Sequence, residues 1–226
     1  MRDTEREIEY DGGAEEAAMR LRMGLLAMAI ALGPVGAAIA QDRMPEIPAD
    51  KLTDAQKKAV EQFTKERGRP VFGPFVALER SPELMLRAEA MGEYLRFHNV
   101  IPQKLMELAI IITARQWTQQ YEWNAHDPLA IKAGLSPEIV KAVAEGRRPQ
   151  AMSDDEDIVF EFCTELHRNR SVSDATYARA VARFGEQGVI ELTSLAGYYT
   201  FLSMVMNTTR TQVPKDSTTP PLASLP

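Results

Sequence analysis

The stretch Glu107-Leu-Ala-Ile-Ile-Ile-Thr-Ala-Arg-Gln-Trp-Thr-Gln-Gln-Tyr-Glu-Trp-Asn-Ala-His126 decides the fold. Its first half is almost entirely aliphatic, which is typical of a buried helix. Its second half places Gln119, Glu122 and His126 at intervals of three and four residues. Residues with this spacing lie on one face of a helix. The sequence therefore predicts an amide, an acid and an imidazole together at the end of an apolar helix.

Glu107 is separated from these groups by about four helical turns, or about 22 Å along a straight helix. It can approach His126 only if the chain bends, and we place that bend between Thr113 and Thr118. With the bend, the acids and the imidazole would converge on one pocket. The predicted site consists of Glu107, Glu122 and His126 as reactive groups, with Gln119 and Trp123 on the pocket wall.

Helix start signals recur along the rest of the chain. Thr53-Asp-Ala-Gln56 and Ser153-Asp-Asp-Glu156 are capping boxes, and Ser136-Pro137 places a cap residue before a proline at the first helical position. Apolar residues between these signals repeat at three and four positions, without sustained alternation. We expect an all-α bundle of about seven or eight helices. Asp127-Pro128 is expected to end one helix at His126 and to start the next.

The spacing Glu-x11-Gln-x2-Glu-x3-His, from Glu107 to His126, resembles the Glu-x11-Cys-x2-Cys-x3-His pattern of alkylhydroperoxidase D and its relatives. Gln119 and Glu122 stand in place of the two cysteines, and the Glu-x3-His form resembles the carboxymuconolactone decarboxylase branch of that superfamily. The resemblance extends from about residue 70 to residue 210. It is supported by the segments Ala130–Ser136, Phe184–Leu192 and Gly197–Thr200.

The resemblance implies an alkylhydroperoxidase D-like helical bundle that forms a homo-oligomer, either a trimer or a hexamer. The family is built from two similar halves; here Glu191-Leu192 echoes Glu107-Leu108, but two residues do not establish two degenerate repeats. The implied activity is that of a cofactor-free lyase on a small carboxylated or lactone-like substrate. His126 would act as general acid and base, Glu122 would orient it, and Glu107 would complete a proton relay.

Two alternatives to this function stay open at the level of sequence. One is the peroxiredoxin-like activity after which the superfamily is named, although no cysteine occupies the motif here. The single cysteine, Cys163, lies between Phe162 and Leu166 on an apolar helical face, so we expect it in the core and exclude an intramolecular disulfide. The other alternative is a non-catalytic exported binding protein. No Cys/His pair has ligand spacing, so we expect no metal site.

The two ends of the chain differ in composition from its centre. Residues 19–40 resemble a signal peptide: a basic start, a short apolar run and an Ala38-Ile-Ala40 cleavage site. Residues 1–18 are acidic and do not fit a signal, which suggests that translation starts at Met19. We expect export to the periplasm or medium, cleavage without stable membrane insertion, a helical domain over residues 41–210 and a disordered tail over residues 211–226.

The overall composition limits the kinds of partner. The chain has 226 residues, of which 45% are hydrophobic, and this is enough for one core-forming domain. Its formal net charge is −6, so it lacks the basic surface that nucleic-acid binding requires. We therefore expect a small-molecule substrate rather than a nucleic acid.

Overall fold

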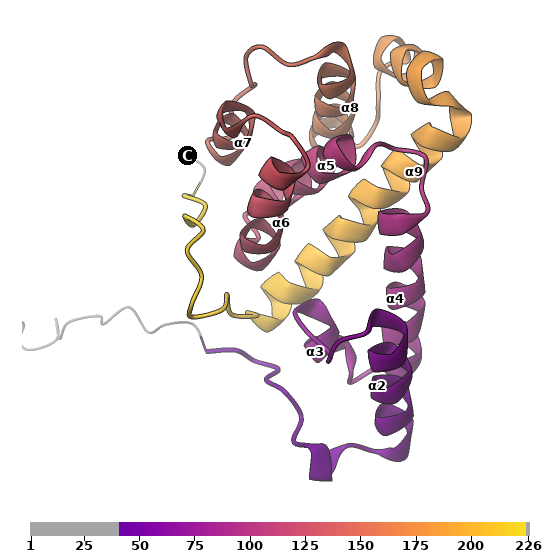
Figure 1. Cartoon of the computed structure of the whole chain (residues 1–226), viewed down its shortest axis with the longest axis vertical. Coiled ribbons are helices and arrows are strands. Elements are labelled where there is room, and N and C mark those ends of the chain that lie inside the picture. Colours follow the sequence, from indigo (N-terminus) through magenta and orange to yellow (C-terminus); the bar gives the residue numbers. More distant parts are fainter. Residues whose placement is uncertain (1–40, 225–226) are drawn as a thin grey trace, which may run out of the picture. The chain divides into compact units, whose positions relative to one another are not determined.

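The computed structural model describes residues 41–224, and the predicted acidic leader and signal peptide lie outside this range. Within it the chain forms one short 3-10 helix and eight α-helices, with no strand, as the sequence predicts (Figure 1). The elements are η1 (Ala49–Lys51), α2 (Asp54–Arg67), α3 (Pro74–Leu78), α4 (Pro82–Phe97), α5 (Gln103–Gln116), α6 (Gln120–Lys132), α7 (Pro137–Ala144), α8 (Asp154–Asn169) and α9 (Asp174–Thr209).

The helix starts follow the capping signals in the sequence. The Thr53 hydroxyl accepts a hydrogen bond from the Gln56 amide, and the Gln56 side chain accepts one from the Thr53 amide. Ser153 and Glu156 form the same reciprocal pair at the start of α8. Each cap satisfies amides that have no partner inside the helix and stabilises it by about 1 kcal/mol. Both predicted capping boxes are confirmed.

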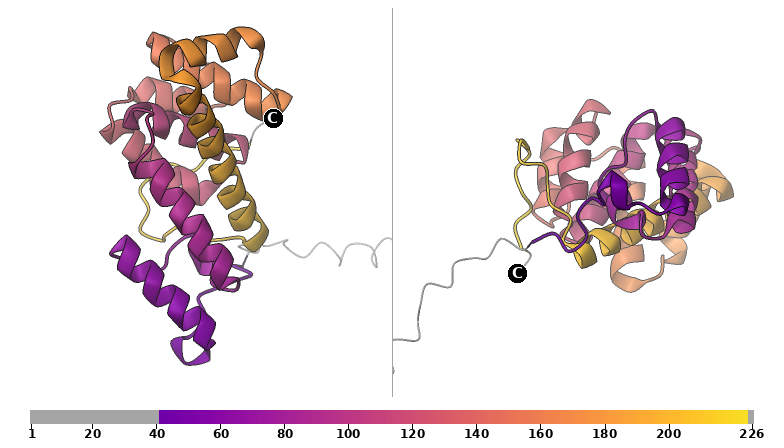
Figure 2. Two further views of the ribbon diagram at one scale, coloured as in Figure 1. Left: turned by 90° about the vertical axis from the view of Figure 1, so that its right-hand side faces the viewer. Right: turned by 90° about the horizontal axis from the view of Figure 1, so that it is seen from below.

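Helix α5 lies at the centre of the core. It packs against α6, α7, α8 and α9, and each residue from Leu105 to Arg115 is buried. A helix buried on all sides must be apolar on all sides, which explains the run Leu108-Ala-Ile-Ile-Ile112. Helix α9 contacts both α4 and α5, so it joins the two sides of the bundle (Figures 1 and 2).

The chain breaks between α5 and α6, where the sequence predicts a bend. Thr118 adopts the left-handed conformation, with φ of 45°, and the Gln119 amide donates to the Ala114 carbonyl over 2.8 Å to close α5. The Gln119 side chain then caps α6, because its Oε1 atom accepts hydrogen bonds from the amides of Tyr121 (2.6 Å) and Glu122 (3.1 Å). The break turns α6 back along α5 and brings distant residues together.

The predicted helix end at His126 is wrong. Helix α6 continues through Pro128, which places His126 in the middle of the helix. A proline inside a helix leaves the carbonyl four residues earlier without its amide donor. Here that carbonyl belongs to Asn124, and the Thr219 hydroxyl lies 3.5 Å from it. The C-terminal segment thus supplies a donor where Pro128 removes one.

Within the tail predicted for residues 211–226, residues 217–223 contact α5 and α6 without forming a helix. The Gln120 side chain pairs with both backbone groups of Leu222, at 2.8 and 2.9 Å. Arg115 donates to the Ala223 carbonyl over 2.7 Å, and the Leu222 side chain is buried. The proline-rich composition excludes a helix but does not prevent side chains of the core from holding an extended chain.

Helix α9 is bent at Gly185, whose φ of 72° and ψ of 174° are not helical. By length and composition α9 is the one described helix that could cross a membrane. However, 56% of its most apolar window is buried inside the protein, which is typical of a core helix.

Candidate active site

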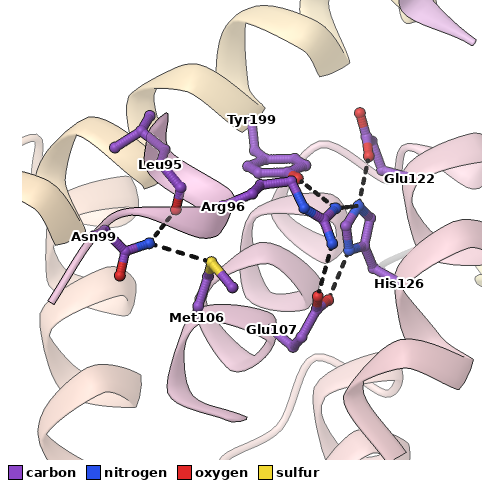
Figure 3. A network of polar contacts seen from close by, with 8 residues as sticks. All are labelled: Leu95, Arg96, Asn99, Met106, Glu107, Glu122, His126 and Tyr199. Atoms are coloured by element: carbon purple, nitrogen blue, oxygen red, sulfur yellow. Dashed lines mark hydrogen bonds and ion pairs between the residues drawn. The ribbon is translucent and has the colours of Figure 1, made fainter. Parts of the chain in front are cut away.

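Four helices bring together a network of charged and polar groups (Figure 3). Nδ1 of His126 on α6 lies 2.7 Å from Oε2 of Glu107 on α5. The other oxygen of Glu107 accepts a hydrogen bond from Arg96 on α4 over 3.2 Å. Glu107 is completely buried, and the Arg96 side chain is only 18% exposed. The predicted approach of Glu107 to His126 is therefore confirmed, and the break between α5 and α6 is what permits it.

This geometry assigns the proton positions on His126. Arg96 is always protonated, so Glu107 pairs with it as a carboxylate. A carboxylate only accepts hydrogen bonds, so Nδ1 of His126 carries the hydrogen and donates it to Glu107. In the neutral imidazole the lone pair is then on Nε2. That atom lies 3.4 Å from Nη1 of Arg96 and 3.5 Å from Oε2 of Glu122.

Glu122 is a buried acid without a close cationic partner. Burial raises its pKa, the charge of Glu107 raises it further, and His126 and Arg96 act in the opposite direction. A raised pKa favours the protonated carboxyl, which can donate a hydrogen bond to Nε2 of His126. The sequence predicts that Glu122 orients the imidazole. The structure gives that role to Glu107, whose contact is much shorter.

The sequence did not identify two members of the network, Arg96 and Tyr199. Burial lowers the pKa of Arg96, but Tyr199 and Glu107 outweigh it and the net shift is upward. Burial raises the pKa of the Tyr199 hydroxyl, so this group stays neutral and accepts a hydrogen bond from Arg96 over 3.1 Å. The Tyr199 ring stands edge-on to the imidazole, with centroids 5.1 Å apart. Arg96 carries no motif that could have revealed it, whereas Tyr199 lies in a segment of the family resemblance.

A cavity of about 370 Å³ opens beside the network. Glu122 and His126 form part of its wall, together with Arg96 and Tyr199. Two further arginines lie at the end of α2 and in the loop after it, and apolar groups form much of the remainder. These lining residues are Arg67, Arg69, Phe72, Phe75, Leu129 and Leu202. A few polar groups in a mainly apolar hollow are typical of a small-molecule site.

The predicted wall residues Gln119 and Trp123 do not line this cavity. Both are buried. Gln119 caps α6, and its amide nitrogen donates to Asn207 over 3.1 Å. Trp123 instead lines a separate hollow, of about 230 Å³, between α6 and the C-terminal segment. The predicted position of Gln119 depends on a continuous helix. The helix is broken before Gln119, so its side chain caps the first turn of α6 instead.

Cys163 is fully buried on α8, where burial raises the pKa of its thiol to about 12. It lines none of the cavities described above and has no link to the His126 network. Within residues 41–224, no cluster of three His, Cys, Asp or Glu side chains could hold a metal ion.

The helix arrangement is that of the alkylhydroperoxidase D-like fold, which confirms the predicted fold class. No known family model and no curated protein sequence matches the chain. Three solved structures are similar in fold, at sequence identities that carry no information on the reaction. The debrominase Bmp8 has a TM-score of 0.60 at 11% identity, covering 77% of this chain and 94% of that one.

The two other structures are both uncharacterized peroxidase-related proteins. The one from Ralstonia eutropha JMP134, described as an alkylhydroperoxidase AhpD core, has a TM-score of 0.61 at 12% identity and covers 77% of this chain and 93% of its own. The one from Silicibacter sp. TM1040 has a TM-score of 0.60 at 14% identity, with 78% and 94% covered. These structures show that the fold is shared, and the single cysteine means that this chain lacks a cysteine pair.

Proposed function

We propose that the chain is a cofactor-free enzyme of the carboxymuconolactone decarboxylase type, which moves a proton on a small carboxylated or lactone-like substrate. One observation carries the proposal: Glu107 holds Nδ1 of His126, which leaves Nε2 beside the buried acid Glu122 on the wall of a cavity. An imidazole next to a carboxyl group whose pKa is raised by burial can both accept and deliver a proton.

The proposed reaction needs no external electron carrier. In decarboxylation the bond between the carboxylate and its carbon breaks, carbon dioxide leaves, and the electron pair stays on the substrate, delocalised into the lactone or a conjugated carbonyl. Glu122 then passes a proton to Nε2 of His126, which delivers it to that carbon, and solvent returns a proton to Glu122. Arg96 remains charged throughout and stabilises the developing oxyanion.

Two further observations support a small, planar and negatively charged substrate. Arg67, Arg69 and Arg96 line the cavity, and their guanidinium groups can bind the carboxylate of an acid. The same fold holds a small planar ring in the debrominase Bmp8, which has been solved in complex with 2,3,4-tribromopyrrole. That ligand belongs to Bmp8, and it supports only the size and shape that we propose here.

We also infer export and self-association, as the sequence predicts. Export rests on the signal-like residues 19–40. Self-association is supported by large apolar side chains exposed on α4 and α9, including Phe97 (63% exposed) and Ile190 (66% exposed). Exposed apolar surface of this kind often marks a contact between subunits. Sedimentation of the purified chain would measure the oligomeric state.

The test is a turnover assay with small lactones and unsaturated carboxylic acids that first raise the melting temperature of the protein. We expect His126→Ala to lower kcat/KM by about 10²-fold or more, because it removes the proton-transferring group. His98→Gln is the matched control, since His98 is exposed and does not line the cavity, and glutamine can keep a hydrogen bond to Glu93. Unchanged turnover in His126→Ala would refute the proposal. Ligands that bind to the wild type without turnover would favour the exported binding protein instead.

A further inference from the structure

Three arginines line the cavity, and two of them are already paired. Arg96 is bound to Glu107 at 3.2 Å. Arg67 lies 3.7 Å from the buried carboxylate of Glu89. Among residues 41–224, no carboxylate forms an ion pair with Arg69, although its side chain faces the same cavity. An unpaired cation at a cavity is available to an anionic ligand.

Among residues 41–224, no acid on the cavity wall lies within ion-pair distance of Arg69. Glu66 lines the cavity, and it accepts a hydrogen bond from Gln62 over 2.9 Å. Glu93 also lines the cavity, and it pairs with His98 at 2.9 Å. Arg69 can therefore form an ion pair with a ligand at this part of the wall.

The guanidinium of Arg69 is held in place by an aromatic ring. Its central carbon lies 3.9 Å from the centroid of the Phe72 ring, a distance typical of a cation–π contact. Phe72 is fixed in turn by Phe63 and Phe75, with centroids 5.9 and 5.6 Å away. A guanidinium stacked on a fixed ring keeps its edge free, and that edge matches a carboxylate with two parallel hydrogen bonds.

We propose that Arg69 binds the carboxylate of a planar organic acid in this cavity. The flat body of the acid would lie among Phe75, Leu129 and Leu202, and its other end would face Glu122 and His126. The orientation of the reacting end rests on the proposed function. The recognition of the acid by Arg69 does not, because it can be measured as binding without turnover. Arg69 would thus be a specificity-determining residue at the mouth of the site.

The experiment is calorimetric titration with benzoate, a planar carboxylate, and with benzamide, its uncharged analogue. We expect Arg69→Gln to weaken benzoate binding by about fivefold to tenfold and to leave benzamide binding unchanged. Arg69→Lys should recover only part of the affinity, because an ammonium cannot form the paired hydrogen bonds. Benzoate affinity should also fall as NaCl is added, since Arg69 is exposed.

Arg87→Gln is the matched control, because Arg87 is exposed and pairs with Glu83 on the surface of α4, outside the cavity. Wild-type affinity for benzoate in Arg69→Gln, an equal loss for benzamide, or no benzoate binding by the wild type would each overturn the inference. His126→Ala should still bind benzoate. If no substrate is turned over but benzoate binding depends on Arg69, the proposed reaction is wrong and the inference that Arg69 binds a carboxylate is still supported.

Discussion

The Glu107 carboxylate lies 2.7 Å from Nδ1 of His126, although the two residues are 19 positions apart in a segment rich in helix-forming residues. The contact exists because the chain reverses at Thr118, where a β-branched residue adopts a left-handed conformation. Such a conformation is unfavourable, and it persists only when its surroundings determine it. Here the side chain of Gln119 does so by capping α6 immediately after the turn.

Glu122→Gln should change how stability depends on pH. Burial raises the pKa of Glu122 in the folded protein, so the folded state binds this proton more tightly than the unfolded state. The contribution of Glu122 to the free energy of unfolding is therefore complete at low pH. It is lost as pH rises above the ordinary pKa of glutamate towards the raised pKa in the folded protein. Glutamine does not ionise, so the variant has no such loss. The variant should therefore gain melting temperature relative to the wild type as pH rises from 4 to 8.

The control for this experiment is Glu83→Gln, at an exposed glutamate on the surface of α4, outside the buried network. A pH effect that appears only in Glu122→Gln belongs to the buried acid. A constant difference for Glu122→Gln would show that the acid is ionised in the folded protein.

Gly73→Ala should destabilise the loop that carries Arg69 more than Gly68→Ala does. Both glycines have positive φ, 53° and 65°, so alanine strains the backbone by about 1–3 kcal/mol, and the strain is larger at Gly73, whose ψ of −126° lies outside the left-handed helical region of Gly68. A Cβ at residue 73 would also lie 2.7 Å from the ring of Tyr121, whereas a Cβ at residue 68 meets nothing within 4 Å. Urea denaturation of both variants measures the difference, and equal losses would exclude the clash with Tyr121.

Cys163 should not take part in peroxide chemistry. Only a thiolate attacks peroxide, and burial raises the pKa of this thiol to about 12 while excluding the reagent. We expect no thiol-dependent peroxidase turnover in the wild type, and Cys163→Ser should keep the native activity. Ellman's reagent should react with one thiol only after unfolding in guanidinium. Peroxide reduction that disappears in Cys163→Ser would contradict this assignment.

The Thr219 hydroxyl should matter only as long as residue 128 is proline. Thr219→Val removes the donor near the Asn124 carbonyl and should cost about 1 kcal/mol. Pro128→Ala restores the backbone amide that normally pairs with this carbonyl. The cost of Thr219→Val should therefore shrink in the Pro128→Ala background, as a double-mutant cycle by thermal unfolding would show. Additive effects would mean that Thr219 does not satisfy this carbonyl.

The fold follows from local features of the sequence, and so does the part of the site formed by Glu107, Glu122 and His126. The capping boxes mark helix starts because they act within four residues, and the aliphatic run of α5 marks the core because every side of it is buried. The bend was predictable because Glu107 and His126 can meet only if the helix is interrupted. These inferences need only spacing and burial.

The remaining features depend on contacts between distant segments, which spacing alone does not reveal. Arg96 reaches Glu107 from another helix, and Tyr199 is 103 positions from Arg96. Pro128 lies within α6, and a hydroxyl from the distant C-terminal segment lies near the freed carbonyl. Helical spacing predicts Gln119 on the wall, but the helix break makes its side chain the cap of α6. Trp123 lies within α6 and lines the hollow beside the C-terminal segment, which spacing does not reveal.

The burial of Cys163 also makes the chain a convenient host for spectroscopic probes. Because it is the only cysteine in the sequence and is inaccessible when folded, no native residue has to be removed before labelling. A substitution such as Pro70→Cys would place a single reactive thiol on an exposed position next to Arg69. An environment-sensitive fluorophore attached there would report directly when the cavity is occupied, without any knowledge of the product.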